Sequence, residues 1–238
     1  MAVWLWVSVL FLFPLPDNRE ATEMASRMEA RYRPAKTLQA TFLERYLENG
    51  RVLRSEAGTA YFRRPGKMRW EYQQPEKDLF LVDGKTAWFY VPADHTVTRV
   101  PAKQSEDLRT PLALLAGQMK ISRICSRVEL ADGEKPLHDG EVVLRCKVRG
   151  ERRGAASTDE LANALGNGGS DAVFFEIAPD SGALTRLIVR QPGGVEVEFR
   201  FENWRFDPPI PESMFRFEPP AGVAIVNGEL TGGKTQGN

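Results

Sequence analysis

The chain has 238 residues, of which 42% are hydrophobic, and its 32 basic side chains balance 32 acidic ones. This length suits one main domain with a sizeable core, and the balanced charge argues against nucleic acid as a partner, because no net field attracts it. Since glycine and proline are frequent and no long low-complexity tract occurs, we expect a globular protein rich in turns.

The first sixteen residues, "MAVWLWVSVLFLFPLP", contain no charged side chain and are almost wholly apolar. The run is shorter than the ~20 residues that a membrane-spanning helix needs, so residues 1–16 predict a secretory signal peptide and export of the rest of the chain. No basic residue precedes the run, and no A-x-A cleavage site follows it before Asp17. An uncleaved N-terminal hydrophobic anchor, or a misassigned start codon, therefore stays open as an alternative.

Residues 21–32 have the pattern of one amphipathic helix. Met24, Met28 and Tyr32 recur every four residues among good helix formers, and Pro34 ends the pattern. We expect these three side chains to lie on one buried face.

From about Thr37 the apolar period changes to two, which predicts a series of short β-strands. Short connections between them favour antiparallel neighbours, with tight hairpins at "DGK" and "QPGG". The expected strands are 37–48, 51–63, 67–73, 79–82, 86–91, 95–100, 121–130, 141–149, 172–178, 183–190 and 195–206.

A short apolar helix interrupts this series at "RTPLALLAG", residues 109–117. Thr110 can cap it and Pro111 suits its first position, while Leu112 and Leu115 fall on one face and Gly117 can end it. The fold class is therefore mainly β (α+β).

The domain organisation follows from the same pattern. Residues 17–226 form one domain, with 151–171 as a long surface loop inserted between strands, because that segment is small and polar. Residues 227–238 are expected to form a flexible tail.

The two cysteines, Cys125 and Cys146, flank the turn "ADGEKPLHDG" on two expected strands. A hairpin symmetric about residues 135 and 136 would place them directly opposite each other, so that an oxidising compartment could join them in a disulfide. The alternative is a pair of small buried apolar side chains, since Cys146 falls on the apolar alternation of its strand.

No pattern in the chain indicates an enzyme, a cofactor or a metal. "GELTGGKT", residues 228–235, matches a nucleotide-binding P-loop, but too few residues follow it to form the helix that would hold the phosphates. His95 and His138 lie far apart and lack ligand spacing, and no G-x-S-x-G motif occurs. Glu196, Glu198 and Glu202 alternate with apolar residues, which favours a solvated sheet face over acid–base chemistry.

The strand 67–73 separates two kinds of side chain. Met68, Trp70 and Tyr72 lie on one face, and charged side chains lie on the other. Such a face is ordinarily core. However, one strongly curved sheet has many apolar residues facing inward and only two expected helices to cover them, so we interpret this face as the wall of a binding cavity.

Several motifs resemble the LolA family of periplasmic lipoprotein carriers. They are "FRRPGKMRWEYQQPEKDLFLVDGKTAWFYVP", "TPLALLAG" and "FRFEPPAGVAIV", in the family's order and spacing over roughly residues 22–226. The resemblance implies an incomplete, strongly curved antiparallel β-barrel whose α-helices form a lid over an apolar cavity. It also implies lipoprotein acyl chains as cargo, an inner-membrane ABC transporter as donor, an outer-membrane acceptor, a monomeric carrier and no covalent chemistry.

The resemblance assigns roles to individual residues. Arg64 matches the arginine that latches the lid in the closed, empty state, against the alternative of an ordinary surface arginine. The positions that match the cargo-facing surface are Met68, Trp70 and Phe80 on strands and Leu112 and Leu115 on the lid helix, against the alternative of plain core.

The predicted function is a periplasmic carrier that moves lipoproteins from the inner to the outer membrane. A LolA-like carrier or sensor for another lipid or glycolipid, membrane-anchored if the first segment is retained, is the alternative. The chain departs from the family pattern at "FLER" (Phe42–Arg45), where the family often has F-x-Q, and in the length of loop 151–171.

Overall fold

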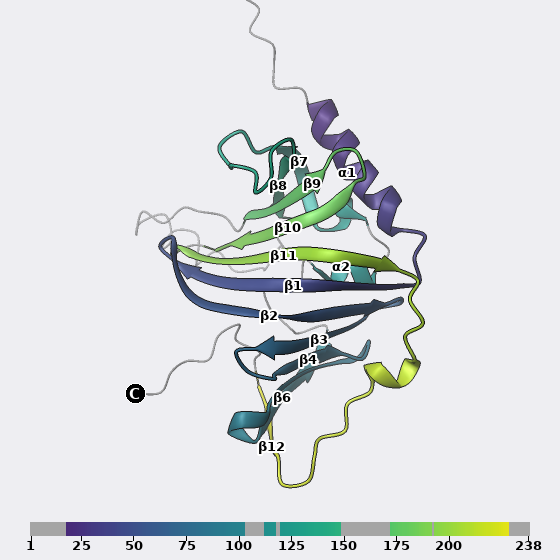
Figure 1. The fold of residues 1–238 in the computed structure, drawn as a ribbon, viewed down its shortest axis with the longest axis vertical. Helices are drawn as coiled ribbons and strands as arrows, with labels where there is room; N and C mark the ends of the chain where they lie inside the picture. Colours follow the sequence, from purple (N-terminus) through teal and green to yellow (C-terminus); the bar gives the residue numbers. More distant parts are fainter. Residues whose placement is uncertain (1–17, 103–111, 118–119, 149–171, 192, 229–238) are drawn as a thin grey trace, which may run out of the picture.

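The computed structural model describes residues 18–102, 112–117, 120–148, 172–191 and 193–228 (Figure 1). Its helices are α1 (Asn18–Tyr32), α2 (Ala113–Ala116) and the 3-10 turns η1 (Pro92–Asp94), η4 (Ile121–Arg123) and η5 (Glu212–Phe215). Its strands are β1 (Thr37–Glu48), β2 (Arg51–Arg63), β3 (Lys67–Gln74), β4 (Leu79–Val82), β5 (Thr86–Val91), β6 (Thr96–Pro101), β7 (Cys125–Leu130), β8 (Val142–Val148), β9 (Ala172–Ala178), β10 (Ala183–Arg190), β11 (Val195–Phe206) and β12 (Ala224–Asn227).

The strands form one open, curled sheet, which confirms the mainly β prediction. Its order is β12-β6-β5-β4-β3-β2-β1-β11-β10-β9-β8-β7 (Figure 1). Neighbouring strands are successive in the chain except for two pairs, β1 with β11 and β6 with β12. All pairs are antiparallel except β12 with β6, which is parallel. The two end strands of this order, β12 and β7, lie at opposite ends of the sheet (Figure 1).

The long helix α1 confirms the prediction from residues 21–32. Met24, Met28 and Tyr32 are buried, as their four-residue spacing indicated, together with Ala21 and Ala25 on the same face. The predicted short helix is present as α2, with Leu112 at its N-cap and Gly117 at its C-cap. Thr110 and Pro111, expected to begin the helix, lie outside the described residues.

Two expectations about strands were wrong. Residues 121–130 do not form one strand, because η4 occupies Ile121–Arg123 and β7 begins at Cys125. Ile121 and Ile124 are three residues apart, which is the spacing of a 3-10 turn, and the Ile124 amide bonds the Ile121 carbonyl at 2.9 Å. Strand β12 was missed because all four of its residues are exposed, so no buried alternation marks it.

The sheet has two chemically different faces, which we call the inner and outer face. The inner face carries α1, α2 and the large apolar cluster, to which alternate residues of β11, Val197, Phe199 and Phe201, belong. The residues between them, such as Glu198, point to the outer face. Along β11, strand alternation thus separates apolar from charged side chains.

Some expectations fall where the structure gives no description. The predicted signal peptide 1–16 and loop 151–171 lie outside the described residues, as does the predicted tail from residue 229 onward. Asn227, at the start of that tail, belongs to β12. Within the described part of the chain, no helix is long and apolar enough to span a membrane.

Candidate functional site: an arginine between two helices above an apolar cluster

Arg64, at the turn between β2 and β3, connects the ends of two helices. Its Nη1 donates to the carbonyls of Arg33, just after α1, and of Ala35, the latter at 2.9 Å, while its Nε donates to the Leu115 carbonyl in α2 at 3.3 Å. The Gly66 amide adds a bond of 2.8 Å to the Ala116 carbonyl. The β2–β3 turn therefore holds the C-terminal end of α2 through two backbone carbonyls.

This position suits a charged group that binds carbonyls. The last carbonyls of a helix have no intrahelical partner and carry partial negative charge, so a guanidinium is favoured beside them. Burial lowers the pKa of Arg64, and the nearby charge of Asp207 opposes that shift; an arginine stays protonated under these conditions. Its Nη2 is buried and has no hydrogen-bond partner among the described residues.

The five residues expected to face cargo lie together on the inner face. The structure buries all of them in the large apolar cluster, with exposed fractions of 6% for Met68, 0% for Trp70 and 1% each for Phe80, Leu112 and Leu115. Trp70 is paired with Phe80 across β3 and β4. The strand and helix positions singled out in the sequence are thus parts of one surface, and α2 covers it.

Trp70 lies at the centre of this cluster. Its ring centroid is 4.7 Å from that of Phe42, 5.5 Å from that of Phe199 and 5.8 Å from that of Phe62, all edge-on. Its Nε1 is buried without a hydrogen-bond partner in the described part of the chain. The contacts of Trp70 that the structure describes are therefore non-directional, of the kind that another apolar group could replace.

The helix α1 is fixed to the sheet by directional bonds. Arg27 Nη1 donates to the Pro179 carbonyl at 2.7 Å, and the buried Tyr32 hydroxyl accepts the Leu184 amide at 2.9 Å. Burial, the largest cause, raises the pKa of Tyr32 to about 12. Gly182 (φ 69°) lies against this helix so closely that an added Cβ would be 2.9 Å from the Arg27 carbonyl. The contact therefore requires glycine.

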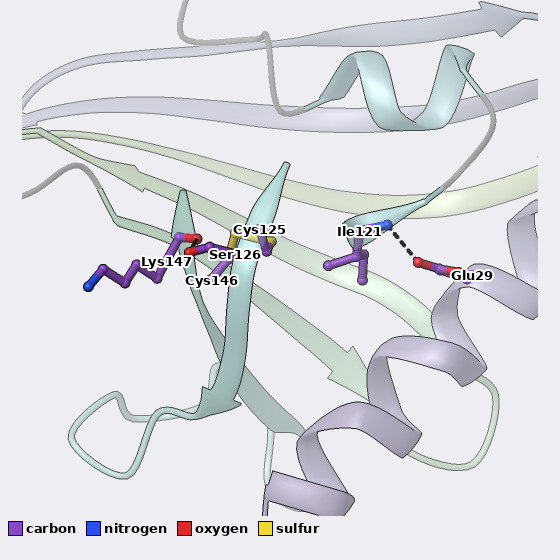
Figure 2. Close-up of a disulfide and its surroundings, with 6 residues drawn as sticks. All are labelled: Glu29, Ile121, Cys125, Ser126, Cys146 and Lys147. Carbon is purple, nitrogen blue, oxygen red and sulfur yellow. Dashed lines mark hydrogen bonds between the residues drawn. A yellow bond between two sulfur atoms is a disulfide. The ribbon is translucent and has the colours of Figure 1, made fainter. Parts of the chain in front are cut away.

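The segment that follows α2 is tied to its surroundings at two points (Figure 2). Glu29 Oε1, on α1, accepts the Ile121 amide at 2.6 Å. Cys125, at the start of β7, is bonded to Cys146 on β8, with Cα atoms 5.3 Å apart. The two cysteines are not directly opposite, because the hairpin is centred on residue 137: Leu130 pairs with Leu144, so Cys146 faces Val128 and Cys125 faces Val148.

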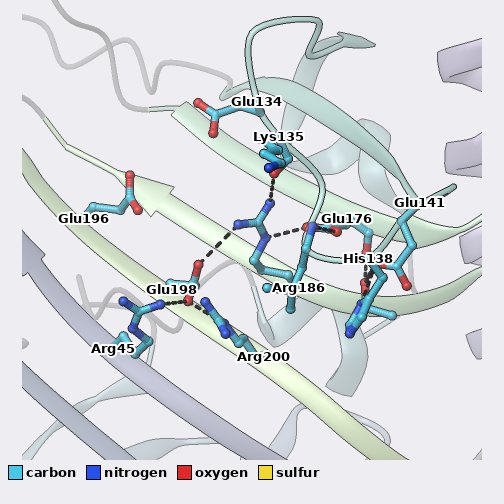
Figure 3. Close-up of polar contacts among 12 residues, drawn as sticks. Arg45, Glu134, Lys135, His138, Glu141, Glu176, Arg186, Glu196, Glu198 and Arg200 are labelled. Atoms are coloured by element: carbon cyan, nitrogen blue, oxygen red, sulfur yellow. Dashed lines mark hydrogen bonds and ion pairs between the residues drawn. The ribbon is translucent and has the colours of Figure 1, made fainter. Parts of the chain in front are cut away.

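The outer face carries a buried network of charges (Figure 3). Arg186 on β10 lies between two carboxylates, with Nε at 2.5 Å from Glu176 and Nη1 at 3.3 Å from Glu198. Glu198 also pairs with Arg45 at 3.1 Å and Arg200 at 2.7 Å. Burial would raise the pKa of Glu198, but the bond and charge of Arg200, with Arg45 and Arg186, lower it.

Two interpretations from the sequence are corrected by this network. Glu198 does not lie on a solvated face, because it is only 4% exposed and is paired with arginines of β1, β10 and its own strand. Glu202, in contrast, is exposed as expected. His138 is also not isolated, since its ring lies with Glu141 and Glu176 such that their ligand atoms are within 4.8 Å of one another. Glu176 bonds Arg186 and the Leu137 amide, and Glu141 accepts from the Thr185 hydroxyl at 2.8 Å, so these carboxylates join loop and sheet.

Comparison with known proteins gives consistent matches. Residues 33–135 match the family described as "Outer membrane lipoprotein carrier protein LolA", and residues 183–227 match one described as "Predicted periplasmic protein". The outer-membrane lipoprotein carrier protein of Dechloromonas aromatica is 30% identical over 192 residues, which cover 80% of this chain and 81% of that one. The protein of the same name from Nitrosomonas europaea is 28% identical, covering 93% and 97%.

A solved structure supports the fold. An uncharacterised conserved protein from Thermus thermophilus superimposes with a TM-score of 0.50 at 16% identity, over 88% of this chain and 99% of its own. From the sequence matches, the chain belongs to the LolA family of outer membrane lipoprotein carrier proteins.

Proposed function

We propose that this protein is a periplasmic carrier that binds the acyl chains of lipoproteins on the inner face of its sheet and moves them from the inner to the outer membrane. The observation that carries the proposal is the position of Arg64. It joins the chain just after α1 to Leu115 of α2, which belongs to the same apolar cluster as Met68, Trp70, Phe80 and Leu112. We interpret the arrangement as the closed, empty form of the carrier.

The apolar cluster suits an acyl chain because it offers area without directional bonds. Each methylene that is buried gains ~0.8 kcal/mol, so an acyl chain requires shielding throughout its passage across water. In the closed form the cluster is shielded from solvent. Cargo would bind by displacing α2, which exchanges contacts of Leu112 and Leu115 for contacts with the acyl chain.

Arg64 sets the balance between binding and release in this proposal. The Arg64 bond to the Leu115 carbonyl and the Gly66 bond to the Ala116 carbonyl exist only while α2 lies against the β2–β3 turn. They stabilise the empty form, and every contribution to the empty form weakens cargo binding by the same amount. A carrier that must hand its cargo over therefore needs such a latch.

The proposed role includes a place and partners. Export by residues 1–16 would bring the carrier to the periplasm, where an inner-membrane ABC transporter would load it and an outer-membrane acceptor would unload it. A monomer suffices for this exchange, because the proposed site is built from one chain. The role requires no catalysis, cofactor or metal.

Replacement of Arg64 tests the proposal. We expect Arg64→Leu to fold and to retain a lipoprotein, but to transfer it to acceptor membranes more slowly, on the order of tenfold, because about 1.4 kcal/mol of closed-state stabilisation is lost. Arg63→Leu is the matched control, since Arg63 bonds Glu212 and the Ile210 carbonyl instead of α2. If Arg64→Leu and wild type transfer the lipoprotein at equal rates, Arg64 does not act as a latch.

A further inference from the structure

The part of the chain that follows α2 is hydrogen-bonded to α1 through Glu29. Glu29 Oε1 accepts the amide of Ile121, the first residue of η4, at 2.6 Å (Figure 2). Glu29 Oε2 lies 3.0 Å from Arg33 Nη2, so both carboxylate oxygens are engaged. Because Ile121 is only 2% exposed, water is a poor replacement for this acceptor.

A covalent bond holds the other side of the same short segment. Cys125 follows η4 almost directly and is joined to Cys146 on β8 (Figure 2). Next to it, the Ser126 hydroxyl donates to the Lys147 carbonyl at 3.0 Å. η4 is therefore fixed to α1 through Glu29 and to β8 through the disulfide.

The attachments of α2 are of a different kind. Its carbonyls at Leu115 and Ala116 bond the side chain of Arg64 and the amide of Gly66, both in the β2–β3 turn. The apolar contacts of Leu112 and Leu115 complete its attachment. α2 and η4 are thus neighbours in sequence that are held by separate parts of the fold.

We propose that Glu29 is a positioning residue that fixes η4 as the stationary end of the lid, so that α2 alone moves when the contacts of Arg64 are lost. The inference rests on the proposed function in treating α2 as the moving part. α1 serves as the fixed frame, because Arg27 and Tyr32 bind it to the turn and strand beyond β9. A carboxylate that accepts a backbone amide forms a charge-assisted bond, which is stronger than a neutral one.

Amide hydrogen exchange in the unliganded, exported protein tests this division. Two amides report on it: Gly66, bonded to α2, and Ile121, bonded to Glu29. In Arg64→Leu we expect Gly66 to exchange faster than in wild type and Ile121 to exchange at the wild-type rate. In Glu29→Ala we expect Ile121 to exchange faster, on the order of tenfold to a hundredfold, since a bond to a charged acceptor is lost.

Two further variants separate positioning from general loosening of the fold. Glu29→Gln keeps a carbonyl oxygen that can accept the Ile121 amide, so it should restore most of the protection. Glu23→Ala is the matched control on the same helix, because Glu23 is 67% exposed and pairs only with Arg27 among the described side chains; it should leave Ile121 unchanged.

Two outcomes would overturn the inference. If Ile121 and Gly66 lose protection together in Arg64→Leu, α2 and η4 move as one body. If Glu29→Ala leaves Ile121 protected, Glu29 does not hold η4. Both outcomes are measured without cargo. If a synthetic triacylated lipopeptide does not bind the wild-type protein, the proposed function is refuted. The exchange rates of Gly66 and Ile121 would still show whether Glu29 holds η4.

Discussion

The two faces of the sheet are held by different kinds of interaction. On the inner face, Trp70 is surrounded by aromatic rings, and the cluster extends to Leu115 of α2 and to Leu112 at its N-cap. On the outer face, Arg186 bonds Glu176, Glu198 and the Lys135 carbonyl, which ties β9, β10, β11 and the β7–β8 loop together (Figure 3). The contacts around Trp70 are apolar and non-directional, and those around Arg186 are charged and directional.

This difference shows how one sheet can keep its shape and still exchange its apolar contacts for contacts with a ligand. Apolar contacts depend on area and are replaced by any apolar group of suitable shape. Ion pairs that are buried depend on geometry and leave an uncompensated charge when one partner moves. We therefore expect the outer face to keep the shape of the sheet while the inner face changes its contacts.

The largest effect is expected from truncation at the centre of the inner face. Trp70→Ala should lower the free energy of unfolding by about 4 kcal/mol, as large-to-small changes of buried aromatic residues do, and should weaken binding of a triacylated lipopeptide. Chemical denaturation and a lipopeptide binding assay measure both quantities.

The control for this change is Trp88→Ala. Trp88 is half-buried, lies 5.5 Å from the ring of Phe217 and donates to Asp83 at 3.2 Å, away from the central cluster. We expect a smaller loss of stability and unchanged lipopeptide binding. If Trp88→Ala weakens lipopeptide binding as much as Trp70→Ala does, the apolar cluster around Trp70 is not the binding surface.

A second, slightly smaller effect is expected on the outer face. Arg186→Leu leaves two carboxylates without their shared cation and should cost about 3 kcal/mol of stability. Lipopeptide release, measured below the unfolding transition, should remain at the wild-type rate. The exposed Arg127, paired with Glu129 at 3.3 Å, gives the control Arg127→Leu, which should change stability by less than about 1 kcal/mol. Altered release in Arg186→Leu would contradict the division between the faces.

The smallest effect concerns pH. The arginines around Glu198 lower its pKa in the folded protein, so its contribution to stability is present above the usual pKa of a glutamate and is lost as the pH falls through the lowered value. Between pH 5 and pH 3 the melting temperature of wild type should therefore fall by a few degrees more than that of Glu198→Gln. If the melting temperatures of wild type and Glu198→Gln fall equally between pH 5 and pH 3, Glu198 does not contribute to stability in this way.

The sequence predicted the parts of the fold that depend on local periodicity. The four-residue spacing of Met24, Met28 and Tyr32 marked α1, and the two-residue alternation around Trp70 marked β3 and its buried face. "DGK" marked a tight turn, where Asp83 Oδ1 accepts the amides of Lys85 and Thr86 at 2.8 Å. Each of these features is determined by residues that are close together in the sequence.

Long-range contacts could not be predicted in this way. Glu198 is buried and pairs with Arg186 on β10 and with Arg45, which lies 153 positions away on β1. The alternation along its own strand shows neither contact and so indicated a solvated face. The bond between Glu29 and Ile121 joins residues 92 positions apart and leaves no pattern in either segment. The role of Arg64 came from the family resemblance, since an arginine before a proline has no distinctive chemistry of its own.

Native mass spectrometry of the protein isolated from a periplasmic fraction tests the central claim most directly, because it weighs what the inner face holds. We expect a population of carrier with one triacylated lipoprotein bound, and a larger bound fraction in Arg64→Leu than in Arg63→Leu. Carrier that is isolated bare under mild handling, or that carries only a free lipid or glycolipid, would contradict lipoprotein transport; the second result would favour a carrier or sensor of another lipid.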